Sequence, residues 1–166
     1  MFLNVIMLFA GLWVLVYSFC EIRVWGSLYF ERNYFCIERF RSAQKATDLL
    51  SCLHNAMLLL FGFLLVAVAL RRCMPENSVG FVRGLLPAGY ALLLVDALAM
   101  ECTVRLRGIR GIRDAIQAQW DAQKRVSPDN DHEVNMMRGA ERVTRIYPRH
   151  VVIVGVCLVL MRVFFL

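Results

Sequence analysis

The sequence is poor in charge and lacks the residue patterns that mark metal sites, disulfide frameworks and catalytic centres. Charged residues make up 19% of its 166 residues, against about 25% in typical soluble domains. The six cysteines form no C-x-x-C pair and have no zinc-finger spacing, so they predict neither a disulfide framework nor a structural metal. The sequence has no Walker motif, nucleophile elbow or Ser/His/Asp order, and we therefore do not expect an enzyme.

Lysine is also scarce, because all but two of the 19 basic residues are arginine. The basic residues form no long run, so the formal net charge of +6 does not predict nucleic-acid binding. Apolar residues, in contrast, reach 59% and are clustered into blocks, against about 45–50% in soluble proteins. This composition excludes an ordinary soluble domain, a disordered tail and a collagen-like fibre. It predicts an all-α integral membrane protein.

Four apolar blocks have lengths suited to crossing a bilayer as helices, since a hydrocarbon core of about 30 Å needs roughly 20 apolar residues. The first two blocks contain no formal charge, and the last two contain only Arg83, Asp96 and Arg162. No small-x-small cleavage site follows the first block, so we expect that helix to be retained. The sequence therefore predicts four transmembrane helices, over residues 2–20, 49–70, 79–100 and 151–166.

Two segments between these blocks have the composition of chain at or outside the membrane surface. Residues 21–48 interleave aromatic and charged side chains, a mixture that favours the headgroup region. Residues 101–147 carry apolar positions at helical spacing on both sides of a polar break, which predicts an extramembrane amphipathic helical hairpin. We expect its first helix to continue directly from the third span, and Pro148 to interrupt the chain before the fourth.

The apolar positions of these two segments could pack on each other or on another protein. An amphipathic stripe at spacings of three and four residues is typical of a helix that buries one face. The candidate partner-docking residues are Trp25, Tyr29, Leu106, Ile109, Ile112, Ile116 and Trp120.

Four ionisable residues fall near one face of the predicted bilayer, because the third span ends where the second and fourth begin. They are His54, Asp96, Glu101 and His150. Ionisable groups in membrane helices are functional candidates by default, and we expect Asp96 to be held by a specific partner. The simplest role is structural. A His–Asp pair could instead relay protons or contact a quinone, and two histidines from different helices could ligate haem, although we predict no cofactor.

The opposite face of the predicted bilayer carries four arginines, which are Arg71, Arg72, Arg83 and Arg162. Long arginine side chains can reach phosphate groups at the membrane surface. Basic pockets between membrane helices bind anionic lipids such as cardiolipin. These residues are therefore candidate lipid-headgroup ligands.

These observations together favour a non-catalytic accessory subunit of a larger membrane complex. The segments outside the spans are short, and their amphipathic and aromatic character suits contact with other membrane-protein subunits. A mitochondrial respiratory-chain or ATP-synthase complex would fit, so we expect the mitochondrial inner membrane in preference to a bacterial inner membrane or the endoplasmic reticulum. The alternatives are a small transporter or channel component, or a haem- or quinone-binding redox protein that uses His54 and His150.

Overall fold

A computed structural model of the chain describes residues 2–30, 41–71, 76–106, 108–122, 124 and 131–164, and every element of regular structure among them is helical. Three long helices come first, and the last part of the chain forms a fourth long helix with a π-helical turn inside it. The elements are α1 (Phe2–Phe30), α2 (Arg41–Leu70), α3 (Glu76–Leu106), α4 (Arg110–Ala122), α5 (Asp131–Glu141), η3 (Arg142–Ile146) and α6 (Tyr147–Phe164).

Four helical stretches are long and apolar enough to cross a membrane, as the sequence predicts. They are Phe2–Gly26, Gln44–Leu70, Gly80–Leu106 and Met136–Phe164. The helices extend beyond most of the predicted limits, because their polar ends remain helical outside the apolar blocks. Residues 165–166 of the fourth predicted span, and residues 31–40 of the predicted surface segment, lie outside the described residues.

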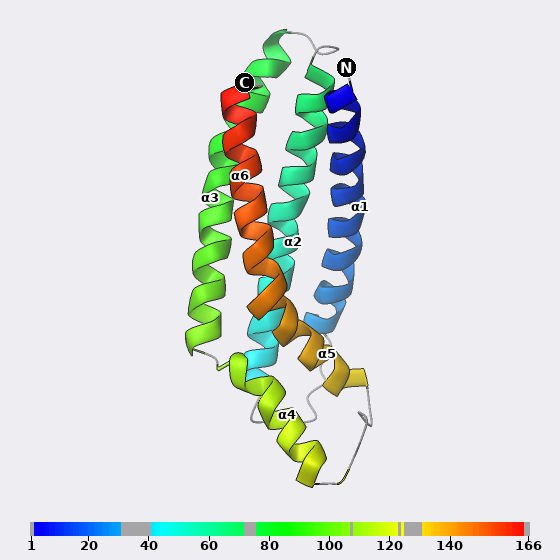
Figure 1. The fold of residues 1–166 in the computed structure, drawn as a ribbon, viewed down its shortest axis with the longest axis vertical. Helices are drawn as coiled ribbons and strands as arrows, with labels where there is room; N and C mark the ends of the chain where they lie inside the picture. Colours follow the sequence, from blue (N-terminus) through cyan, green and yellow to red (C-terminus); the bar gives the residue numbers. More distant parts are fainter. Residues whose placement is uncertain are drawn as a thin grey trace.

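The long helices lie side by side, with the start of α1 and the end of α6 at one end of the bundle and α4 and α5 at the other (Figure 1). Helix α2 is the most buried of the four. It contacts both α1 and α3, and α3 in turn contacts α6. A core cluster that includes Leu64, Val68, Leu86 and Leu158 fills the space between α2, α3 and α6.

Helix α1 packs mainly on α2, and two glycines bring the two backbones together. A Cβ atom on Gly11 would lie 2.9 Å from the carbonyl oxygen of Gly62 and 2.8 Å from a methyl group of Val66. A Cβ atom on Gly62 would lie 3.1 Å from the carbonyl oxygen of Gly11. Neither position has room for a larger residue. Small residues at such crossings are typical of membrane helices, where close packing replaces the hydrophobic effect as the driving force.

The prediction that the third span continues unbroken into the hairpin is wrong, because the chain turns at Gly108. This glycine has a φ of +64°, in the left-handed region that commonly ends a helix. The amide of Gly111 then bonds to the carbonyl of Gly108, and the amide of Ile112 to that of Ile109, which begins the turn of α4. The left-handed residue thus lets α4 leave the line of α3.

The prediction that Pro148 interrupts the chain is also wrong, since α5, η3 and α6 form a continuous helical path. Proline lacks an N–H, and in an α-helix its ring clashes with the carbonyl four residues earlier, here that of Thr144. Thr144 lies in η3, where the amide of Tyr147 bonds to the carbonyl of Arg142. The wider π turn opens the helix just before the proline, so the chain remains helical.

Candidate functional site

Three ionisable side chains from three helices form a hydrogen-bonded row inside the bundle. Nδ1 of His54 on α2 lies 2.7 Å from Oδ2 of Asp96 on α3. Nε2 of the same imidazole lies 3.1 Å from Nδ1 of His150 on α6. His54 and Asp96 are 0% exposed, and His150 is partly exposed. The expected partner for Asp96 is therefore present, and the row links α2, α3 and α6.

The imidazole of His54 is held in place by an aromatic ring as well as by hydrogen bonds. The ring of Tyr147 stacks on it, with centroids 3.9 Å apart and an interplanar angle of 19°. Tyr147 precedes His150 by three residues, so the two lie on one face of the last helix. This i, i+3 spacing is the sequence signal that could have placed Tyr147 at the site.

Helix α2 continues the polar character of the site along its buried face. Gln44, Asp48, Ser51 and Asn55 lie at intervals of three or four residues and are all buried. The amide of Gln44 donates to Asp48, and the amide of Asn55 donates to the carbonyl of Ser51. Among the described residues, several buried polar atoms have no hydrogen-bond partner, including Asp48 Oδ2, Asn55 Oδ1 and Asp96 Oδ1. A bundle held together only by apolar packing would not contain these buried polar side chains, so this face of α2 distinguishes the site from the rest of the core.

With Asp96 as a carboxylate and both imidazoles neutral, the hydrogen bonds of the row allow one arrangement of protons. The carboxylate can only accept, so Nδ1 of His54 donates to it. The other nitrogen of a neutral His54 must then accept, and Nδ1 of His150 must donate to it. Nε2 of His150 is left as a hydrogen-bond acceptor, and within the described part of the chain no donor contacts it.

This geometry does not suit haem ligation by His54 and His150. Both ring nitrogens of His54 are engaged, one by Asp96 and the other by His150, so neither is available to iron. The two imidazole rings are also stacked, with centroids 5.3 Å apart. In the described part of the chain, no three histidine, cysteine, aspartate or glutamate side chains are placed so that they could hold a metal ion. Glu101 stays outside the row, because it is exposed and pairs with Arg105 one turn along α3.

A groove lies beside the row, between α1 and α6 and over α2. Its volume is about 340 Å³. His150 is part of its wall, together with aromatic and aliphatic side chains that include Trp13, Tyr17, Phe61 and Ile153. Trp13 and Ile153 are exposed on the outer surface of the bundle, so the groove opens sideways, at the level of the apolar spans.

A second polar contact joins α1 to η3 near the hairpin end of the bundle. The guanidinium of Arg142 bonds to Glu21, which also accepts a 2.7 Å hydrogen bond from the indole of Trp25. Arg142 lies 5.2 Å from the centroid of that indole ring. The spacing of Glu21 and Trp25 along α1 is visible in the sequence. Their partner is 121 residues away from Glu21, which no local pattern indicates.

Most of the candidate docking residues are used for packing inside the chain. Ile109, Ile112, Ile116 and Trp120 join one core cluster with residues of α5 and η3, and Trp25 is buried as well. The stripe of α4 therefore packs on the chain's own α5. Of the two predicted alternatives, packing within the chain and packing on another protein, the structure shows the first for these side chains. Leu106 is different, being 81% exposed at the end of α3. The side chain of Tyr29 lies outside the described residues.

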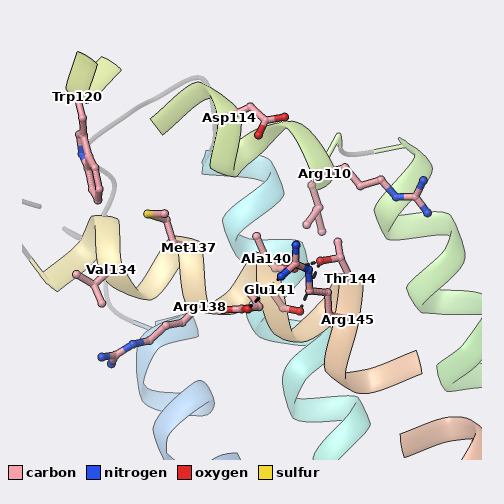
Figure 2. Close-up of a pocket in the computed structure, with 11 residues that line it drawn as sticks. Arg110, Asp114, Trp120, Val134, Met137, Arg138, Ala140, Glu141, Thr144 and Arg145 are labelled. Atoms are coloured by element: carbon pink, nitrogen blue, oxygen red, sulfur yellow. Dashed lines mark hydrogen bonds and ion pairs between the residues drawn. The ribbon is translucent and has the colours of Figure 1, made fainter. Parts of the chain in front are cut away.

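The same α4–α5 pair leaves a hollow of about 770 Å³ on one side, which we call the hairpin hollow. Figure 2 shows Trp120 and Met137 in the space between the two helices and charged side chains around it. Three of these are the arginines Arg110, Arg138 and Arg145. Arg145 pairs with Glu141 at 3.7 Å, whereas the other two have no ion-pair partner among the described residues.

The arginines at the opposite end of the bundle are brought together in part. Arg83 on α3 and Arg162 on α6 line one pocket of about 360 Å³, with Tyr90 also in its wall. Both guanidinium side chains are exposed, and none of the described residues that line the pocket is acidic. Arg71 follows α2 directly and interacts with another group, while Arg72 lies outside the described residues.

No protein-family model, curated protein or solved structure matches the chain.

Proposed function

We propose that this chain is an integral membrane protein and a non-catalytic accessory subunit of a larger membrane complex. The observation that carries the proposal is the hairpin hollow. Its floor is apolar and aromatic and its edge is basic, at the end of the bundle where α4 and α5 lie outside the apolar block of α3. An apolar centre with arginine around it is typical of an interface with a partner protein.

The charges of the hollow indicate what its partner carries. Arg110 and Arg138 have no acidic partner in the described part of the chain, and Asp114 and Glu141 are the acidic side chains nearby. Arginine outnumbers carboxylate in the wall, so the best complement is a segment of another subunit that presents acidic side chains on either side of an apolar one.

Reversing two of these charges is expected to release the chain from its complex. The double variant Arg110→Glu and Arg138→Glu repels an acidic segment but leaves the buried stripe of α4 intact, so the stoichiometric partner should be recovered about tenfold less or worse. The measurement is affinity purification in digitonin followed by quantitative mass spectrometry.

Arg23→Glu with Arg149→Glu is the matched control, because both exposed arginines lie outside the hollow and the two substitutions make the same charge change. It should retain the partner. Equal recovery from the double variant and the control would contradict the docking role, and so would a wild-type chain that purifies without a stoichiometric partner.

We further propose that the pocket between Arg83 and Arg162 binds the phosphate groups of an anionic lipid. Two guanidinium groups from neighbouring helices suit a lipid with two phosphates, such as cardiolipin. This chemistry also supports the mitochondrial inner membrane as the location, with a respiratory-chain or ATP-synthase complex as the assembly.

Removing both charges should weaken lipid retention. Arg83→Gln with Arg162→Gln is expected to reduce cardiolipin binding by about tenfold or more, since each basic group near a membrane surface contributes about 1 kcal/mol. Native mass spectrometry after exchange into mixed cardiolipin–phosphatidylcholine nanodiscs would measure it. Arg23→Gln serves as the control, because Arg23 lies on α1 toward the hairpin end of the bundle, away from the pocket. This variant should bind like wild type. A double variant that keeps its cardiolipin would show that the pocket is an ordinary basic surface.

A further inference from the structure

The groove beside His150 combines three properties that an ordinary lipid-facing surface does not have. Its volume of about 340 Å³ falls within the range of small-molecule sites. Aromatic rings from α1 and α2, those of Trp13, Tyr17 and Phe61, line it. Behind it, His150 is connected through His54 to a fully buried carboxylate.

The hydrogen-bond row determines which polar group the groove can accept. With Asp96 as the terminal acceptor and both imidazoles neutral, each imidazole uses its Nδ1–H toward the interior, and Nε2 of His150 remains an acceptor. A ligand therefore has to donate a hydrogen bond. A ligand that enters between α1 and α6 also has to be lipid-soluble, because the groove opens among the apolar side chains of the spans.

We propose that this groove binds a lipid-soluble molecule with a hydroxyl group on a flat ring, of the phenol or hydroquinone class. The ring stacks among the aromatic side chains, and its hydroxyl donates to Nε2 of His150. Asp96 and His54 are positioning residues, which hold the His150 imidazole in the tautomer that accepts. The inference rests on the proposed membrane placement of the helices, but not on the accessory role.

The row is suited to holding this tautomer because neither hydrogen bond can reverse alone. If Nδ1 of His150 became an acceptor, Nε2 of His54 would have to donate, and Nδ1 of a neutral His54 could then only accept from a protonated Asp96. A His54 that donated from both nitrogens would be an imidazolium, which needs one more proton in the row. The stacking of Tyr147 and His54 also fixes the orientation of the central ring. The preference for a donor ligand is therefore a property of the whole row.

The test uses the purified full-length chain in phosphatidylcholine nanodiscs, with ¹⁵N-labelled histidine, and titrates it with decylhydroquinone. The ¹⁵N signal of His150 Nε2 is expected to shift on binding, and His150→Gln identifies this signal. The dimethyl ether of the same hydroquinone keeps the ring but cannot donate, and should bind about tenfold more weakly, the equivalent of one hydrogen bond.

Two neighbouring tryptophan substitutions separate the groove from the general surface. Ile153→Trp fills the groove and should reduce hydroquinone binding by about tenfold or more, whereas Val152→Trp adds the same ring to an exposed position outside it and should have no effect. Equal affinities for the hydroquinone and its ether, or unchanged binding by Ile153→Trp, would overturn the proposal. Because no partner subunit is present, a failure of the accessory role leaves this result unaffected.

Discussion

Replacing Asp96 with alanine is expected to lower the free energy of unfolding by about 1–3 kcal/mol. The carboxylate is the acceptor for Nδ1 of His54, and both side chains are completely buried. Removing it leaves an imidazole N–H without a partner in a dry interior. Hydrogen bonds between membrane helices average less than this, but here the acceptor is a carboxylate and two further groups, His150 and Tyr147, are aligned by the same ring.

Unfolding in mixed micelles with increasing SDS, followed by tryptophan fluorescence, would measure the loss. Asp114→Ala is the control, because Asp114 is exposed on α4 and its removal should change stability by no more than about 0.5 kcal/mol.

Asp96→Asn keeps an acceptor oxygen and should lose less stability than Asp96→Ala. If Asp96 has a structural role, Asp96→Asn should lower the yield of assembled complex and leave the turnover of each assembled complex unchanged. Normal yield with abolished turnover would instead favour proton transfer, and an unchanged Asp96→Ala would contradict the role of the row in stability.

Replacing Gly11 with valine is expected to separate α1 from α2 and to lower stability by about 3 kcal/mol, near the upper end for overpacking. The new side chain would meet the backbone carbonyl of Gly62 as well as the side chain of Val66, and a backbone cannot adjust by changing rotamer. Since α1 packs mainly on α2, the whole helix has to move away to make room.

Gly84→Val provides the comparison, because a Cβ atom at Gly84 meets no atom within 4 Å. Both substitutions place the same β-branched residue in the interior of a spanning helix, so their difference isolates the contact. The same SDS unfolding experiment measures both variants. A Gly11→Val protein as stable as Gly84→Val would show that the two backbones do not touch as the structure has them.

The presence of four long apolar helices was predictable, because the length of an apolar block alone indicates a helix that can span a membrane. The position of Asp96 near His54 and His150 also followed from the sequence. Antiparallel helices bring the end of one span to the level of the beginning of the next, although the pairing of Asp96 with His54 was one of several that this level allowed. The function of the row did not follow, since structural and protonic roles use the same residue types.

Other features depended on contacts that no single-chain pattern encodes. The approach of Gly11 to Gly62 requires knowing the crossing point of two helices, and the bond between Arg142 and Glu21 requires knowing which face η3 presents to α1. A proline usually ends a helix, so Pro148 predicts a break, and the π turn that accommodates it has no sequence signature of its own. The apolar stripe of α4 suits an internal or an external partner equally well, and only the position of α5 in the structure shows that the partner is internal.

The way the row ends at Asp96 limits what it could carry electrically. A proton taken up at Nε2 of His150 can move to His54 and then to Oδ2 of Asp96, but Oδ1 has no hydrogen-bond partner among the described residues. The path therefore enters from the groove and has no described exit on the other side. Such a row can take one proton from the groove and return it by the same route. No net charge then passes through the row over time. Within the described residues, the row is thus suited to hold one charge at a time.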